Sequence, residues 1–478
     1  MWLYLCHLQK WHTLWHNRLI DVPKLFMEMK KTILIIIMFY IAISFNIYGQ
    51  EKLWTLEDCI NYAVSNNIGL QRQVLQTETS QANLLKSKMD LLPSLNFGSD
   101  ARIGFGRSID PVTNLITFKQ NISNSYSLNS NLQLFSGFAA INTVSANKFM
   151  YMAGLENEKI VRNNLVLQIL GQYYQVIYSK GLENASRLRL ELSENQLFRI
   201  RKLVETGREA VSRQLEMESQ VSADKLSLTI ALNTASQDVT TLKQMLQLDP
   251  GAEFDVNIPD LEEILIRDQQ YDTDSIYQIA SQVLPRLKAI DYELRASRKQ
   301  IAAAKGSVSP SISVGGAIYT GFYKVIGEDI GEQASFSDQM KNNNSQAIYL
   351  SLSVPLFNNY TLGRNIRLAK IRKDDNELKL ELEKNALYTE IENVCLNYNR
   401  GRDEYSAAES NLDYNRKSYD AVEKKFEAGL VDVTIYAASK TALYNAEIEE
   451  IRTKLQLIIR NFAVQFYSTG EYDKIILN

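Results

Sequence analysis

Apolar and polar side chains alternate along four stretches of the chain, at residues 95–105, 126–135, 312–322 and 348–357. In the first stretch, Leu95, Phe97 and Ile103 fall on one face. Asp100 and Arg102 fall on the other. A period of two residues predicts β-strands with one apolar and one polar face. Such strands are typical of a membrane β-barrel, although alternation alone also fits a soluble β-sandwich with one wetted face.

The stretches that follow the strands are predicted to be long helices. Residues 139–248 and 356–478 contain no proline and are rich in leucine, alanine, glutamate, lysine and glutamine, a composition that favours helix. A helix over residues 139–205 would be about 100 Å long and needs equally long neighbours to pack against. Gly207 and Gly429 stand where each helix must turn back. Each stretch is therefore predicted to form a long antiparallel coiled-coil hairpin.

The chain also repeats itself. Phe135 closes one alternating stretch and Phe357 closes another, at a spacing of 357 − 135 = 222 residues. The same offset relates further identical pairs: Lys148 and Lys370, Ile169 and Ile391, Glu205 and Glu427, Gly207 and Gly429. Upstream of these, an offset of 217 relates other pairs: Leu70 and Leu287, Lys88 and Lys305, Pro93 and Pro310. We interpret the chain as a duplicated unit whose function depends on what both units build together.

This duplication defines the predicted domains. The first repeat, residues 51–248, contains a helix, a strand pair at about 94–137 and a helical hairpin that turns near residue 207. A proline-containing linker occupies residues 249–273. The second repeat, residues 274–478, contains the same elements, with its strand pair at about 311–357 and its turn near residue 429.

The N-terminal region has the pattern of a secretory signal. Met29 precedes two lysines, an apolar run over residues 33–45 and a small residue, Gly49. We therefore predict a signal peptide at residues 29–50. The alternative, a membrane anchor, is disfavoured because the run is shorter than the ~18 to 20 residues that span a bilayer. Residues 1–28, which hold all three histidines, are predicted to be a spurious upstream extension.

Charge and composition exclude several classes of function. The formal net charge is −3, and removing the net charge of +3 on residues 1–31 leaves −6 for the predicted mature chain. No basic excess indicates a nucleic-acid partner. Cys59 and Cys395 are not equivalent in the repeat and indicate neither a disulfide framework nor a metal site. Without mature histidines or a phosphate-binding glycine loop, we predict no catalytic, cofactor or metal site, and no enzyme.

The number of strands predicts an assembly. Four strands cannot close a barrel with an interior, and an open sheet in lipid leaves unpaired backbone groups that cost several kcal/mol each. The sheet edges must therefore pair with other copies of the chain, so that the polar faces line a shared water-filled bore. Asp100 and Arg102 are predicted to face that bore, although a structural pair on the strand surface is an alternative. The long polar loops at residues 107–124 and 324–345 suit the outer face of a bacterial outer membrane.

The order of these elements resembles the TolC family of outer membrane efflux proteins over residues 51–470. The resemblance depends on an ordered set of short motifs: Leu56-Glu57-Asp58, Leu132-Gln133-Leu134-Phe135-Ser136-Gly137, Val354-Pro355-Leu356-Phe357 and Phe426-Glu427-Ala428-Gly429-Leu430. The loop Gly106-Arg107-Ser108-Ile109-Asp110-Pro111 also resembles members of the family from the Bacteroidetes.

This resemblance implies a mainly α fold, a location and a function. Long antiparallel coiled coils would form an α-helical barrel in the periplasm, and three copies would share their strands in one twelve-stranded barrel in the outer membrane. The homotrimer would dock to a periplasmic adaptor (membrane fusion) protein and an inner-membrane pump. The predicted function is the exit duct of a multicomponent efflux or type I secretion system, through which solutes move passively.

In the TolC family the two helical turns form the periplasmic mouth. The resemblance therefore assigns adaptor docking to residues of both turns: Glu205, Gly207, Arg208, Glu209, Glu427, Gly429, Leu430 and Asp432. Family members often carry an aspartate about six residues after the turn glycine, whereas this chain has Arg213 and Ile435. We treat Arg213, Glu216 and Ile435 as candidates for a constriction. Plain helical turns with solvated charges are the alternative.

A second function remains open at this point. A periplasmic coiled-coil adaptor or scaffold could carry the alternating segments as small soluble β modules. Salt washing would remove such a scaffold from membranes, whereas a barrel needs detergent.

Overall fold

The computed structural model describes residues 53–109, 114, 116–118, 120–259, 271–326 and 334–470. The predicted extension and signal peptide, loop residues 110–113 and linker residues 260–270 lie outside the described residues. The chain divides into two compact units, Met1–Trp54 with Asp249–Asn257, and Thr55–Leu248 with Ile258–Asn478. In the smaller unit, the Trp54 amide donates to the Asp255 carbonyl at 2.9 Å, and the Asn257 amide donates to the Trp54 carbonyl at 2.8 Å.

Helices make up most of the larger unit. Those of the first half are α3 (Leu56–Asn66), α4 (Ile68–Met89), α5 (Ala139–Glu205) and α6 (Val211–Met245). Thr55 and Asp58 form a capping box that starts α3. The break between α3 and α4 falls at Asn67, whose side chain accepts from the Leu70 amide at 3.0 Å and so caps α4. We predicted one helix here, although Pro285, which stands 217 residues after Ile68, interrupts the equivalent helix of the second half.

The second half has the same helices at the same two offsets. They are α7 (Thr273–Val283), α8 (Pro285–Gly306), α10 (Thr361–Glu427) and α11 (Val433–Thr469), with a short α9 (Phe336–Asn342) in the loop between strands. Adding 217 carries the start of α3 to that of α7, and adding 222 carries both ends of α5 to those of α10. Pro285 begins α8, where its missing amide hydrogen costs no helical bond.

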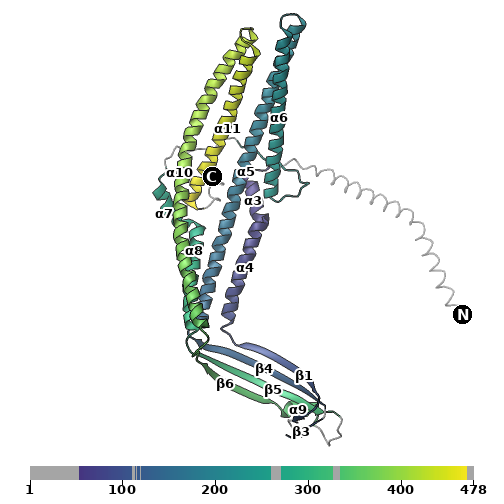
Figure 1. The fold of residues 1–478 in the computed structure, drawn as a ribbon, viewed down its shortest axis with the longest axis vertical. Helices are drawn as coiled ribbons and strands as arrows, with labels where there is room; N and C mark the ends of the chain where they lie inside the picture. Colours follow the sequence, from purple (N-terminus) through teal and green to yellow (C-terminus); the bar gives the residue numbers. More distant parts are fainter. Residues whose placement is uncertain are drawn as a thin grey trace, which may run out of the picture. The chain divides into compact units, whose positions relative to one another are not determined.

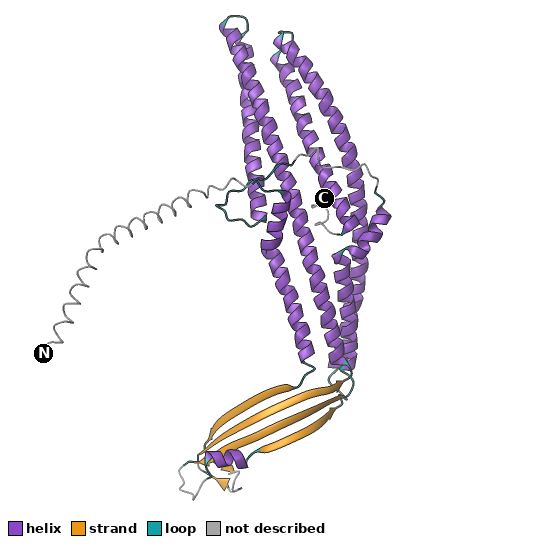
Figure 2. Ribbon diagram, turned by 180° about the vertical axis from the view of Figure 1, so that it is seen from behind, coloured by secondary structure: helices purple, strands orange, loops and turns teal. Residues whose placement is uncertain are grey.

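The long helices pack as two hairpins, α5 with α6 and α10 with α11, whose turns lie at the end opposite the sheet (Figures 1 and 2). Helix α8 packs against both α5 and α10, and α4 packs against α5. The core between them contains large fully buried side chains from both halves, including Ile169, Tyr173, Leu387, Ile391 and Tyr398. The expectation of equally long neighbours is wrong. Helices α5 and α10 have 67 residues each, and shorter helices share the task of covering them, α6 with α4 along α5 and α11 with α8 along α10.

The four predicted strands form one antiparallel sheet in the order β1-β4-β5-β6. They are β1 (Ser94–Gly104), β4 (Asn121–Ser136), β5 (Ser311–Val325) and β6 (Ser345–Ser353); a two-stranded hairpin, β2 (Ser108–Ile109) and β3 (Ile116–Thr117), is separate. The predicted mainly α fold with four strands is confirmed. Strand β6 ends before Leu356 and Phe357 because Pro355 has no amide hydrogen to continue the ladder.

Both connections from a strand to a long helix use the same backbone conformation. Gly137 and Phe138 have φ values of 59° and 61°, and their equivalents at an offset of 222, Asn359 and Tyr360, have 52° and 65°. The duplication therefore extends to two consecutive left-handed residues, a conformation that costs energy at three of these four positions.

Among the described residues, no helix has the length and apolar character needed to cross a membrane.

Candidate functional site

The strand register sorts the sheet into two chemically distinct faces. Phe97 lies opposite Leu128, and Leu128 lies opposite Ile318. Val314 lies opposite Leu350 in the same way. Cross-strand partners share a face, so apolar side chains of all four strands gather on one side of the sheet. Phe97 and Leu350 are each 71% exposed in the isolated chain. Exposure of this extent shows that no described part of the subunit covers these side chains of the apolar face.

The opposite face is polar. Asp100 lies opposite Ser125, and Arg102 lies opposite Ser123. Both charged side chains are exposed on this face, as the alternation predicted, and the described residues contain no ion pair between them. The polar face also carries Tyr349, whose ring covers Gly315 so closely that a Cβ there would overlap it. The sheet thus has a wettable side that could line an aqueous path.

Both edges of the sheet lack a neighbour. In the part of the chain that the structure describes, β1 pairs with β4 alone and β6 pairs with β5 alone. The outer backbone groups of both strands therefore have no ladder partner within the subunit. In lipid such groups need partners from another chain.

The two hairpin tips have closely similar turns. Gly207 and Gly429 have φ values of 70° and 73°, and a Cβ at either position would meet nothing within 4 Å. The Arg208 amide donates to the Leu203 carbonyl at 2.8 Å, and the Leu430 amide donates to the Lys425 carbonyl at 2.9 Å. This is the Schellman pattern that ends a helix at a left-handed residue.

The other proposed docking residues differ in their surroundings. Glu205 and Arg208 are exposed, and Leu430 is 74% exposed. Glu427 accepts from Arg199 at 2.5 Å, which joins the second hairpin to the first. Asp432 caps α11 by accepting from the Ile435 amide at 2.9 Å. The first tip has no such cap, because the N-cap residue of α6 is Ala210, whose side chain cannot accept a hydrogen bond.

Arg213 connects the two tips. Its Nη1 donates to Glu209 Oε1 at 2.7 Å and its Nη2 donates to the Val431 carbonyl at 3.1 Å. Its guanidinium carbon also lies 4.9 Å from the centre of the Phe426 ring. Glu216 and Ile435 are exposed. Of the three constriction candidates, Arg213 is thus engaged within the subunit.

An apolar cluster lies below this contact and is shared by both hairpins: Leu197, Ile200 and Met217 from the first, Tyr419, Phe426, Val433 and Tyr436 from the second. The Phe426 and Tyr436 rings stack with centres 4.5 Å apart. Burial raises the pKa of Tyr419, whose hydroxyl lies 3.1 Å from that of Tyr436. The tips of one subunit are therefore packed together.

A buried charged cluster, which the sequence reasoning missed, joins the hairpins further along. Lys440 Nζ lies 3.0 Å from Asp224 Oδ2, and their side chains are 3% and 0% exposed. Lys440 also donates to the Arg189 carbonyl at 2.5 Å and to Ser193 Oγ. Burial lowers the pKa of Lys440, and the Asp224 charge opposes that shift. Arg189 Nε approaches Asp224 Oδ1 at 2.8 Å. The cluster ties α5, α6 and α11 together.

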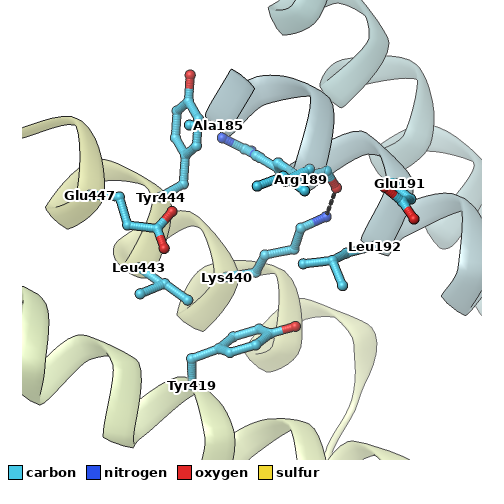
Figure 3. A pocket seen from close by; sticks show the side chains of 10 residues that line it. Ala185, Arg189, Glu191, Leu192, Tyr419, Lys440, Leu443, Tyr444 and Glu447 are labelled. Atoms are coloured by element: carbon cyan, nitrogen blue, oxygen red, sulfur yellow. Dashed lines mark hydrogen bonds between the residues drawn. The ribbon is translucent and has the colours of Figure 1, made fainter. Parts of the chain in front are cut away.

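A cavity of about 260 Å³ lies next to this cluster, between α5 and the second hairpin (Figure 3). Figure 3 shows Lys440 reaching the Arg189 backbone, with Tyr419, Tyr444 and Glu447 around the opening. Burial raises the pKa of Glu447, and Arg416 opposes this shift. The described residues include no group of three side chains that could hold a metal ion.

Comparisons with known proteins agree with this architecture. The profile of the outer membrane efflux protein family matches residues 276–468. Two proteins of Pseudomonas putida, the probable efflux pump outer membrane protein SepC and the toluene efflux pump outer membrane protein TtgF, are each 20% identical over 426 residues. The match covers 88% of this chain and 84% of each relative. The Campylobacter jejuni CmeC outer membrane channel superposes with a TM-score of 0.73 at 15% identity, over 88% of either chain.

These matches identify the family and its location. The specific likeness of residues 106–111 to Bacteroidetes members stays a prediction. Channels of the family are trimers that act with efflux pump components. The chain belongs to the TolC family of outer membrane efflux proteins and is an outer membrane efflux channel rather than an enzyme.

Proposed function

We propose that three copies of this chain form a passive exit duct. In it, the four-stranded sheets combine into one barrel in the outer membrane and the helical hairpins continue its bore into the periplasm. The observation that carries the proposal is the register of the sheet. It gathers apolar side chains on one face and Asp100, Arg102 and serines on the other. The apolar face would contact lipid, and the polar face would line the bore.

The open sheet edges support the shared barrel. Among the described residues, strands β1 and β6 have no outer neighbour, and each unpaired backbone group would cost several kcal/mol in lipid. Pairing β1 of one copy with β6 of the next satisfies both edges and generates a closed ring by rotation. Among closed rings, a trimer matches the family.

We further propose that the tips around Gly207 and Gly429 dock a periplasmic adaptor protein, which links the duct to an inner-membrane pump. Exposed residues at both tips supply a surface for this contact, namely Glu205, Arg208 and Leu430. Glu427, Glu209 and Asp432 instead hold the tips in shape through Arg199, Arg213 and the α11 amides. Substrates would pass without chemistry, driven by the partner.

Single-channel recording in planar bilayers tests the duct. We expect the purified, detergent-extracted protein to form pores of uniform conductance. A matched pair of neighbours on β6 sharpens the test, because Leu350 lies on the apolar face and Ser351 on the polar face. Leu350→Arg should lower the yield of inserted protein, since an arginine facing lipid costs about 2–4 kcal/mol near the bilayer centre. Ser351→Arg should insert normally and lower the cation permeability of the pore.

Two results would contradict the proposal. One is a correctly folded assembly that conducts no ions. The other is equal behaviour of the two arginine variants, since a soluble scaffold has no lipid-facing side. A protein that leaves membranes on washing with salt would favour the scaffold instead.

A further inference from the structure

Four helices adjoin the sheet at the same end of its strands. The register pairs Ser311 with both Ser136 and Ser353, and it pairs Ser94 with Asn131. The start of β1, the end of β4, the start of β5 and the end of β6 therefore lie at one end of the sheet. Short connections lead from there to α4, α5, α8 and α10 (Figure 2).

The helix ends at this level carry charge of a single sign. We consider the eleven helical residues nearest the sheet in each helix, a layer about 16 Å deep at 1.5 Å per residue: residues 79–89, 139–149, 296–306 and 361–371. These segments contain no aspartate and no glutamate. They contain nine basic residues: Lys86, Lys88, Lys148, Arg298, Lys299, Lys305, Arg364, Arg367 and Lys370. Across the whole chain, by contrast, acidic residues slightly outnumber basic ones, 55 to 52. We call these nine residues the basic belt.

Most of the belt is not neutralised within the subunit. Lys86 pairs with Asp90, which directly follows α4, and Arg298 approaches Glu377 at 3.5 Å. The other seven are exposed and have no carboxylate partner among the described residues. Clustered charges of one sign create a potential over the surface, and among the described residues of this layer only Asp90, at its margin, opposes it.

The internal repeat preserves part of the belt. Lys88 and Lys305 are related by the offset of 217, and Lys148 and Lys370 by the offset of 222. The repeat does not preserve the buried charged cluster, because the residue equivalent to Asp224 is Ala446. Lysines therefore stand at two pairs of repeat-equivalent positions on four different helices, and the part of the chain that the structure describes gives them no carboxylate partner.

A layer of exposed apolar side chains separates the belt from the strands. Leu356 and Phe357 are 92% and 86% exposed, and Phe138 and Tyr360 are 62% and 64% exposed. Aromatic residues at this level are typical of the boundary between hydrocarbon and headgroups. Moving from the sheet toward the helices, the surface thus changes from apolar strand face, to aromatic residues, to cations.

We propose that the basic belt binds the phosphate groups of anionic phospholipids in the leaflet that faces the helices. The inference rests on the proposed insertion of the sheet in the outer membrane, which sets the belt at headgroup depth. Lysine and arginine stems lie along apolar surface while their charged ends reach the headgroups. Each such cation contributes about fivefold in affinity for an anionic surface at low salt.

Lipid retention by the purified oligomer tests the belt. The protein is equilibrated in detergent with equal amounts of phosphatidylglycerol and phosphatidylcholine, and the bound lipids are counted by native mass spectrometry. The belt variant replaces the four repeat-related lysines together, as K88Q, K148Q, K305Q and K370Q. A control variant replaces four exposed lysines elsewhere, as K225Q, K384Q, K424Q and K425Q.

The wild type and the control should retain phosphatidylglycerol preferentially. The belt variant should lower that preference at least fivefold, and so should raising the salt concentration for the wild type. Arginine at the same four positions should restore the preference. An unchanged preference in the belt variant would overturn the proposal. If the unchanged preference came with an altered anion-to-cation permeability ratio, these lysines would instead lie in the bore.

Failure of the lipid-binding proposal can be distinguished from failure of the proposed duct. Pore formation by the belt variant in bilayers of phosphatidylcholine alone should equal that of the wild type. A wild-type protein that forms no pore there contradicts the proposed function, whereas normal pores without lipid preference contradict only the belt.

Discussion

The two hairpin tips share a backbone and differ in their side-chain contacts. Gly207 and Gly429 adopt nearly the same φ and make the same hydrogen-bonding pattern. The position six residues later holds Arg213 in the first tip, where it reaches across to Val431 and Phe426. The equivalent in the second tip is Ile435, which is 48% exposed. The turn is therefore the same in both tips, and the side chains differ in a way that joins one hairpin to the other.

The same difference appears deeper in the helices. Asp224 of the first hairpin pairs with Lys440 of the second, but their repeat equivalents are Ala446 and Glu218. Only one of two geometrically equivalent places therefore holds a buried charge pair. Backbone turns follow from local rules that act alike in both halves, whereas ties between the halves require unlike residues.

The largest effect is expected at this buried pair. Lys440→Met leaves the buried Asp224 carboxylate with Arg189 as its remaining cationic partner, which should lower the free energy of unfolding by about 3 kcal/mol. The double variant Asp224→Leu with Lys440→Met should recover only part of that loss, because it removes the buried pair but leaves Arg189, whose side chain is 13% exposed, without its carboxylate. Thermal unfolding followed by circular dichroism measures both. Lys225→Met, on the exposed face beside Asp224, is the control and should change stability by no more than about 0.5 kcal/mol.

The next largest loss of stability is expected when the glycine of either turn is replaced. Gly207→Ala and Gly429→Ala should each cost about 1–2 kcal/mol, because the left-handed conformation is strained for alanine even where space is open. The two losses should be equal within error in the same unfolding assay. A clearly larger loss at one tip would mean that contacts, and not backbone strain, set the cost there.

A smaller effect tests the helix caps. Asp432→Ala should cost about 1 kcal/mol, because the Ile435 amide loses its acceptor. Ala210→Asp should give a similar gain at the start of α6, where no side chain caps the helix. If adding the aspartate fails to stabilise the protein, the free amides at the start of α6 do not limit its stability.

The smallest effect depends on pH. Burial raises the pKa of Glu447 above its ordinary 4.5, so the native state holds that proton more tightly than the unfolded state. Stability is therefore lost as pH rises from 4.5 through the raised value. Glu447→Gln should stabilise the protein at neutral pH and lose this advantage below pH 4.5. Unfolding midpoints of both proteins measured from pH 4 to 8 test this prediction. If Glu447→Gln remains more stable than the wild type in acid, its stability gain comes from packing and not from the raised pKa.

Local patterns were enough to predict much of the fold. Alternation identified four strands, and the lack of proline followed by Gly207 or Gly429 identified the long hairpins. The family, the location and the absence of enzymatic function agree with the comparisons. The docking and constriction residues remain predictions.

What the sequence did not reveal depends on contacts between distant segments. Asp224 and Lys440 are separated by 216 residues, and in a highly charged helix either one reads as part of a solvated face. The short helix α9 is likewise held by a separate element, the strand β5. Gln339, for example, bonds both the amide and the carbonyl of Tyr323. Such bonds become visible only when the partner strand is in place.

The central claim is that the sheet edges of this chain are completed by other copies of the same chain. Light scattering of the detergent-extracted protein, corrected for bound detergent, measures the mass of the assembly directly. We predict three times the mass of the processed subunit. A folded, stable monomer would leave the edges of β1 and β6 unpaired and would contradict the account.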